Sequence, residues 1–393
     1  MTLKEALDEH KGIGPGFHFL RHFLSVSIIL WHCRQAVYWT HSAEILAAQG
    51  KINIGLSRAL EWNLEDVVRP GVHALVGTFF ALSGFLVAGS AIRTGSMGRF
   101  FANRALRIFP ALGVETLLSA LILGPLVTEL SLRAYFTDHE FFRYFGNIVG
   151  FVYFWLPGVF LHLPLPRTVN GQLWTLPSEF YCYLIMLGLM ATSLIKKRDL
   201  LLWVGIIAMA AMVGLYQYSP QQFDPKSENM FAPWYIVVLF FIGALYFFHA
   251  EKIPLKFWMF VVSAAAYWAL IFYNVFTPLS GVFLTYCMAY VGFMNFRWWD
   301  KLVQSDYSYG LFLYHFPIIQ TYMYVLHPHI IDLALPRQML LIFGLSLPTT
   351  LAFAALSWRF IEKPALSLRT AFAKTRVVSD ITAANETAVK TPR

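Results

Sequence analysis

Arg21 and His32 lie eleven positions apart in the apolar stretch "FLRHFLSVSIILWHC", residues 19–33. In an α-helix, a spacing of eleven residues is just over three full turns, so both side chains project from one face, about 16 Å apart along the axis. One helix face then carries a fixed cation and a titratable imidazole, which suits anion binding and general-base catalysis. The alternative is that both are ordinary polar residues at the ends of a membrane helix.

A second basic pair, Arg104 and Arg107, occurs in "NRALRIFP" (103–110). At a spacing of three the two guanidinium groups share a helix face, and planar, forked donors of this kind bind phosphate groups well. Positive charge at the cytoplasmic end of a membrane helix would also explain either arginine taken alone. The pair is therefore a candidate phosphate clamp.

Three further polar side chains interrupt apolar stretches, where polar groups are costly and are candidates for function. Ser83 precedes a glycine in "GTFFALSGFLVAG", although small residues there also allow helices to pack closely. Glu179 lies in "QLWTLPSEFYCYL", together with Trp174, and His315 lies in "YSYGLFLYHFP".

The elements that position these residues must be membrane helices, because the composition excludes an ordinary soluble protein. Hydrophobic residues make up 58% of the 393 residues, charged residues only 13%, and the mean hydropathy is +0.56. Soluble domains carry about 25% charged residues. The three cysteines, Cys33, Cys182 and Cys287, lie in apolar segments and are expected to be small buried side chains, so we expect no disulfide and no metal site.

The apolar runs predict an all-α polytopic membrane protein of about ten spans, with both termini in the cytoplasm and no cleavable signal peptide. In this topology twenty Lys and Arg lie on the cytoplasmic side, nine lie on the outer side and Arg21 lies within the membrane. This positive-inside bias explains the net charge of +8 without a nucleic-acid partner. The predicted spans are 17–39, 71–92, 106–127, 172–194, 200–218, 232–250, 255–273, 276–295, 307–326 and 338–360.

Two outer segments need separate treatment. Residues 146–166 are apolar enough for another span but contain three prolines, so we expect an interfacial or re-entrant segment or a loop resting on the membrane. Residues 40–70 are predicted to form a long loop, either solvated or in contact with a substrate through Trp62, Glu65, Asp66 and Arg69.

Several of these motifs together resemble the acyltransferase 3 family, integral-membrane enzymes that O-acylate sugars and other small acceptors. Arg21 and His32 match its motif of arginine or lysine, ten residues, then histidine, and "FFALSGF" (79–85) matches its second-span motif. Arg104 and Arg107 match its RxxR motif. Trp174 to Glu179 resembles its tryptophan-serine-leucine block with a downstream glutamate, with threonine for the usual serine.

The remaining matches are "SYGLFLYHFP", similar to the family's SYxxYLxHxP block, and "RFIEKPAL", similar to its closing element. The resemblance covers residues 17–366, which predicts one transmembrane domain there. A cytoplasmic segment, 1–16, precedes it, and a cytoplasmic tail, 367–393, with a disordered end, follows it. No fused soluble esterase-like domain is expected.

The resemblance implies acyl transfer from cytoplasmic acyl-CoA, a co-substrate, with no permanently bound cofactor. Arg21, Arg104 and Arg107 would bind the acyl-CoA. His32 would accept the proton of the attacking hydroxyl, although an acyl-histidine intermediate is the other possibility. Candidate supporting or acceptor-binding residues are Glu179, Ser83, Trp174 and His315.

The expected acceptor is a sugar hydroxyl of a surface glycan, glycolipid or oligosaccharide, and the expected group is acetyl, at the bacterial inner membrane. The alternatives that the sequence leaves open are a macrolide or another small molecule as acceptor and a longer acyl chain as the transferred group. The sequence does not define the oligomeric state. A transporter is the alternative from another class, because polar residues at mid-membrane and interrupted helices also mark transporters. Against it, the sequence has no internal repeat, and its arginine pair lies at the predicted cytoplasmic end of a span.

Overall fold

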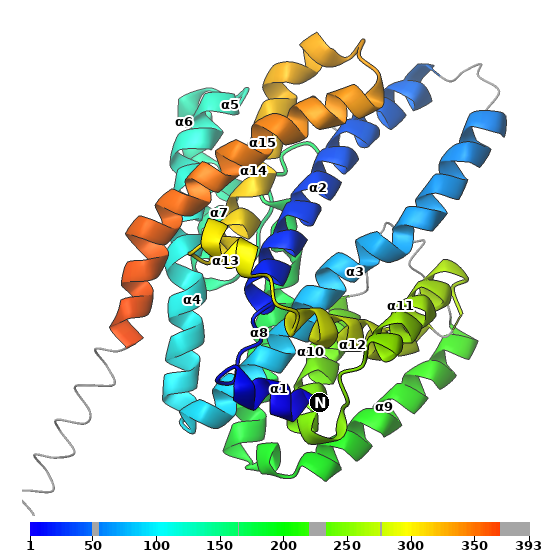
Figure 1. The fold of residues 1–393 in the computed structure, drawn as a ribbon. Coiled ribbons are helices and arrows are strands. Elements are labelled where there is room, and N and C mark those ends of the chain that lie inside the picture. Colours follow the sequence, from blue (N-terminus) through cyan, green and yellow to red (C-terminus); the bar gives the residue numbers. More distant parts are fainter. Residues whose placement is uncertain (49–54, 164, 220–232, 276, 370–393) are drawn as a thin grey trace, which may run out of the picture.

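The computed structural model describes residues 1–48, 55–163, 165–219, 233–275 and 277–369, without the side chains of 39–66. Within these residues the chain forms helices and three isolated β-bridges but no strand. The all-α polytopic membrane fold predicted from the apolar runs is therefore confirmed (Figure 1).

Each of the ten predicted spans overlaps a different α-helix, although several helices begin or end well outside the predicted bounds. These helices are α2 (Phe17–Ala48), α3 (Gly55–Thr94), α4 (Met97–Leu118), α8 (Leu176–Ala191), α9 (Arg198–Tyr218), α10 (Pro233–Phe248), α11 (Phe257–Phe272), α12 (Ser280–Gly292), α14 (Ser308–Ile330) and α15 (Leu335–Ser357). Turns of π-helix extend α4 into α5 (Gly124–Val127) and continue α15 through Glu362. The shorter helices are α1 (Leu3–Glu9), α6 (Leu132–Thr137), α7 (His139–Tyr144) and α13 (Arg297–Leu302).

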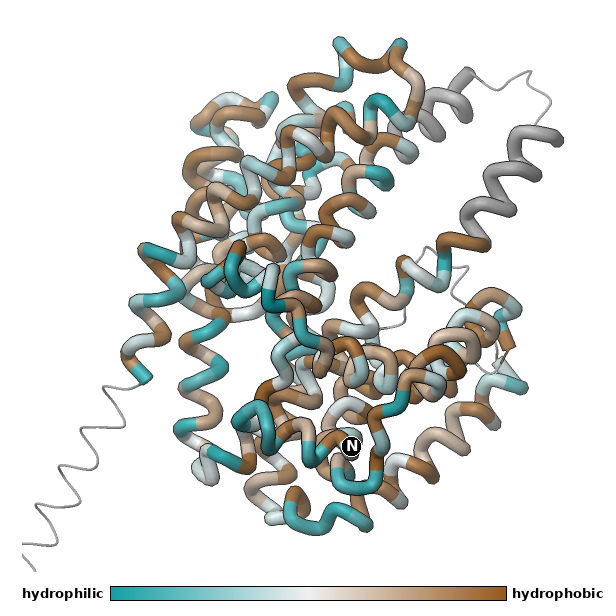
Figure 2. Tube along the Cα trace, in the orientation of Figure 1, coloured by the Kyte–Doolittle hydropathy of each residue, from teal (hydrophilic) through white to brown (hydrophobic). Residues whose placement is uncertain are grey.

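Five helical stretches among the described residues are long and apolar enough to cross a membrane: 67–94, 97–127, 171–191, 198–218 and 335–369. α10 and α11 are apolar but shorter. Hydrophobic residues run along most of the helices, while hydrophilic ones are frequent in the turns near the N-terminus (Figure 2). Ten spans with both ends in the cytoplasm stays a prediction.

Two groups of helices frame the interior. α2, α14 and α15 pack against one another, and α3 packs along α10 (Figure 1). α4 and α8 contact each other, and both also contact α3. The catalytic candidates on α2, α4, α8 and α14 are thereby brought around one interior space.

The crossing of α3 and α10 depends on two glycines. A Cβ at Gly84 would overlap the carbonyl oxygen of Phe240, and one at Gly243 would overlap that of Ala81. Each glycine thus lets the backbone of one helix lie directly against the other, as small residues do between membrane helices. The close-packing explanation of the "SG" pair in this segment is therefore correct for Gly84.

We expect Gly84→Val to prevent formation of the folded protein, because neither backbone can move away without separating α3 from α10. Fluorescence-detected size exclusion in detergent should show loss of the monodisperse peak. Gly188→Val is the matched control on α8, because no atom lies within 4 Å of a Cβ built at that position. A normal peak from the Gly84 variant would contradict the close crossing.

The region 40–70 differs from its prediction as a long loop. α2 continues to Ala48 and α3 begins at Gly55, so most of the region is helical; Leu, Ala, Glu and Arg, all good helix formers, are common in 55–66. The side chains of Trp62, Glu65 and Asp66 lie outside the described residues. Arg69 is buried and donates to the carbonyl oxygens of Ile271 and Phe272 at 3.1 and 2.7 Å, so it holds the end of α11.

Residues 146–166 contain no α-helix in their described part, in agreement with the prediction from their prolines. Leu156, Val159 and Phe160 are fully buried within a hydrophobic cluster, so this irregular segment packs against protein. The three cysteines are free thiols; Cys33 and Cys182 are buried, as expected, whereas Cys287 is partly exposed. The C-terminal tail beyond residue 369 lies outside the described residues.

Candidate active site

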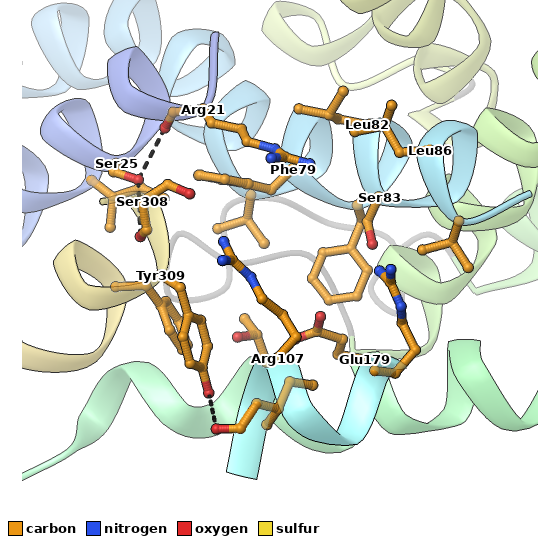
Figure 3. Close-up of a pocket in the computed structure, with 18 of the residues that line it drawn as sticks. Arg21, Ser25, Phe79, Leu82, Ser83, Leu86, Arg107, Glu179, Ser308 and Tyr309 are labelled. Carbon is orange, nitrogen blue, oxygen red and sulfur yellow. Dashed lines mark hydrogen bonds between the residues drawn. The ribbon is translucent and has the colours of Figure 1, made fainter. Parts of the chain in front are cut away.

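A cavity of about 210 Å³, here called the first chamber, lies between α2, α3, α4, α8 and α14. Arg21, Arg107 and Glu179 reach it from three different helices, and Ser83 lies on its α3 wall (Figure 3). Arg104 and His315 also line it. The structure therefore brings Arg21 and both members of the predicted clamp to one cavity.

Asp306 organises the arginines of the first chamber. Its Oδ2 accepts hydrogen bonds from Arg21 and Arg107, each at 2.9 Å, and its Oδ1 accepts one from the Ser308 hydroxyl. Arg107 also lies 3.5 Å from the carboxylate of Glu362. Arg21 and Arg107 are thus held in place by internal anions.

The charges of this cluster persist over the working pH range. Burial raises the pKa of Asp306, but the guanidinium groups of Arg107 and Arg21 outweigh it and hold this pKa well below its usual range. The carboxylate therefore loses its charge only in strong acid. Arg104 differs from its neighbours, because its buried Nε has no hydrogen-bond partner among the described residues and its guanidinium lies 5.9 Å from the ring centre of Tyr183.

Glu179 occupies the α8 wall of the first chamber, where it accepts a hydrogen bond from the Tyr183 hydroxyl. The sequence had suggested that Glu179 supports the candidate base, His32, or binds the acceptor. In the structure the side chain bonded to His32 is His315, and Glu179 faces the arginines instead.

A smaller cavity of about 70 Å³, the second chamber, continues along α2 from the first. It is lined by residues that include His32, Gln172 and Trp174. The two cavities share four lining residues, Ile28, Val76, Thr175 and Phe312. Because Arg21 lines only the first chamber and His32 only the second, the cation and the imidazole act in adjoining spaces.

His32 and His315 link the two chambers by a direct hydrogen bond. Nδ1 of His32 lies 2.7 Å from Nε2 of His315, and Nδ1 of His315 lies 2.9 Å from the carbonyl oxygen of Leu311. His315 is fully buried. The contact joins residues 283 positions apart in the chain.

These contacts fix the positions of the protons when both rings are neutral. A carbonyl oxygen can only accept, so Nδ1 of His315 carries the hydrogen and its Nε2 is an acceptor. Nδ1 of His32 must then donate to it, which leaves Nε2 of His32 without a proton. That nitrogen is the atom of His32 left to accept a proton in the second chamber.

Most residues of this site were predicted from the sequence, but Asp306, Tyr183 and Gln172 were not. Asp306 directly precedes the "YSYGLFLYHFP" segment, and an acidic residue at the start of a helix that carries a candidate site could have been noted. Gln172 and Tyr183 both lie in the quoted "QLWTLPSEFYCYL". Nothing in their types separated them from ordinary polar residues of a membrane helix.

Comparison with known proteins shows which family the chain resembles. The acyltransferase 3 family model, described as an acyltransferase domain, matches residues 15–359. The chain is 30% identical over 301 residues to an O-acetyl transferase of Shigella phage Sf6, covering 72% of this chain and 82% of the relative. It is 27% identical over 397 residues to Nodulation protein 10 of Rhizobium leguminosarum bv. viciae, covering 94% and 98%. No solved structure matches the chain.

The chain belongs to the acyltransferase 3 family. It is a membrane O-acyltransferase, and the predicted enzyme class, an acyltransferase of the O-acetyltransferase type, is confirmed.

Proposed function

We propose that the protein transfers an acetyl group from cytoplasmic acetyl-CoA to a sugar hydroxyl of a surface glycan, glycolipid or oligosaccharide, at the bacterial inner membrane. The observation that carries this proposal is the pair of adjoining chambers, one lined by arginines and the other by His32. The name of the Shigella phage relative, an O-acetyl transferase, supports acetyl as the transferred group.

The donor belongs in the first chamber. Phosphate groups are best held by guanidinium groups, and Arg104 is the arginine with an unpaired buried N–H among the described residues of this chamber. The cavity of about 210 Å³ is too small for a whole coenzyme A, so it takes the part of the donor between the phosphates held at Arg104 and the thioester, while the rest of the nucleotide lies outside it. The thioester carbonyl would lie at the junction of the chambers, near Thr175 and Phe312.

The acceptor hydroxyl approaches from the second chamber. Its oxygen attacks the thioester carbonyl while its proton passes to Nε2 of His32, and collapse of the tetrahedral intermediate breaks the C–S bond. The leaving thiolate then takes the proton from His32, which restores the neutral base. While His32 is charged, Nε2 of His315 accepts a charge-assisted hydrogen bond from it.

The donor role of the first chamber is tested with purified protein in lipid nanodiscs and labelled acetyl-CoA. We expect Arg104→Lys to keep the positive charge but to weaken acetyl-CoA binding about ten- to a hundredfold, the effect of losing one charged hydrogen bond. Arg99→Lys, on the exposed N-terminal turn of the same helix, is the control. Equal acetyl-CoA affinity in both variants would contradict the donor site.

The glycan acceptor is tested in cells. Mass spectrometry of surface glycans should show acetyl groups with the gene that are missing without it. Because the chain belongs to an acyltransferase family, the transporter considered from the sequence is not proposed.

A further inference from the structure

Gln172, one of the residues that line the second chamber, has a buried side-chain oxygen without a partner in the described part of the chain. The residue is 2% exposed and lies in the 3₁₀ turn Gly171–Thr175 that leads into α8. Its Nε2 donates to the carbonyl oxygen of Leu313 at 2.8 Å and to Oδ1 of Asn170 at 3.3 Å. Its Oε1 has no hydrogen-bond partner among the described residues.

The orientation of this amide follows from its neighbours. Rotating it by half a turn would place an oxygen against the Leu313 carbonyl, which cannot donate. Oδ1 of Asn170 is an acceptor because Nδ2 of Asn170 donates to both carboxylate oxygens of Glu115 at 3.0 Å. Both N–H groups of Gln172 are therefore committed, and Oε1 is the atom left over.

An unpaired buried oxygen of this kind is costly, and native proteins seldom keep one without a reason. Gln172 lines the same small cavity as His32, whose Nε2 is also an acceptor without a proton. These two acceptors call for a ligand with two donors. Trp31 and Trp174 add apolar surface to a wall that also carries the polar side chains of Gln35 and His73, and such apolar surface suits the C–H face of a ring.

We propose that the second chamber is an acceptor subsite for a vicinal diol, in which one hydroxyl donates to His32 and reacts while its neighbour donates to Gln172 Oε1. The proposal rests on the acyl transfer proposed above and narrows the acceptor to rings with adjacent hydroxyls. A volume of about 70 Å³ admits one edge of such a ring. A lone alcohol would leave the Gln172 oxygen unpaired.

Two simple acceptors test the proposal with the purified full chain in nanodiscs and acetyl-CoA. trans-1,2-Cyclohexanediol has the second donor, whereas trans-2-methoxycyclohexanol keeps the oxygen there but cannot donate. We expect kcat/KM for the diol to exceed that for the ether about tenfold, after allowance for its two equivalent hydroxyls, the effect of one buried hydrogen bond. Equal kcat/KM values for the diol and the ether with the wild-type protein would contradict the proposed subsite. This comparison requires no variant.

A substitution then assigns the effect to the residue. In Gln172→Met the ratio of kcat/KM for the diol to kcat/KM for the ether should fall to about one, so that the preference is lost. Gln338→Met, which removes a buried glutamine bonded to Ile331 and Leu333 and outside both chambers, should keep it. A preference that survives in the Gln172 variant would also overturn the subsite.

The same assay separates this proposal from the underlying function. No acetyl transfer to either cyclohexane probe, with CoA still released in the presence of a surface glycan preparation, would overturn the subsite alone. Absence of CoA release under every condition would overturn the proposed function.

Discussion

Replacing His32 by alanine is expected to lower acyl transfer about 10²–10⁴-fold, the usual contribution of a positioned general base. The protein should still insert and accumulate, because His32 lines a cavity and bonds one side chain, His315. The loss should fall on turnover, since the arginines around the first chamber are untouched. Acetyl-CoA affinity should therefore stay within about twofold of the wild-type value.

The measurement is single-turnover acetyl transfer by purified protein in nanodiscs, together with a separate acetyl-CoA binding assay. His18→Ala is a matched control, because His18 lies on the same helix but lines neither chamber. More than about a tenth of wild-type turnover in the His32 variant would remove it as the general base.

The helices could be predicted from the sequence because hydrophobicity is a local property. Each long apolar run overlaps a different α-helix, and the proline-containing segment 146–166 has no α-helix in its described part. The region 40–70 was misjudged for the opposite reason. Its polar residues mark the end of the apolar run but do not stop a helix, so α2 and α3 continue past that point.

The shared face of Arg21 and His32 on α2 could also be predicted, because the positions of residues on a helix face follow from spacing alone. Arg21 and His32 do open onto adjoining cavities. What spacing could not show is which partners each would have. Arg21 bonds Asp306 and His32 bonds His315, and these pairs are 285 and 283 positions apart.

The arginine clamp shows this limit most clearly. Arg104 and Arg107 share a face and line one chamber, as predicted, yet their environments differ. Arg107 lies between Asp306 and Glu362, while Arg104 lies beside Tyr183. Only the packing of α14 and of the turn after α15 against α4 creates this difference, and no local pattern encodes it.

Replacing His315 by methionine is expected to lower turnover about 10²-fold or more while acetyl-CoA binding is retained. Methionine fills a similar volume, but its thioether sulfur is too weak an acceptor to hold the hydrogen bond from Nδ1 of His32. His32 would then be free to adopt the other tautomer, with the proton on Nε2, where it cannot act as a base. His315 is thus a positioning residue, comparable in role to the carboxylate that orients the histidine of a catalytic triad.

A conservative variant separates this role from a structural one. In His315→Gln the side-chain oxygen lies near the position of the histidine Nε2 and can accept from His32, so this variant should recover about tenfold in turnover over His315→Met. His249→Met is the matched control, because His249 is buried and lies 3.2 Å from the Leu245 carbonyl four residues before it, but lines neither chamber. Equal turnover in the methionine and glutamine variants would show that the hydrogen bond to His32 does not set the tautomer, because volume is nearly constant while the acceptor atom is present in only one of them.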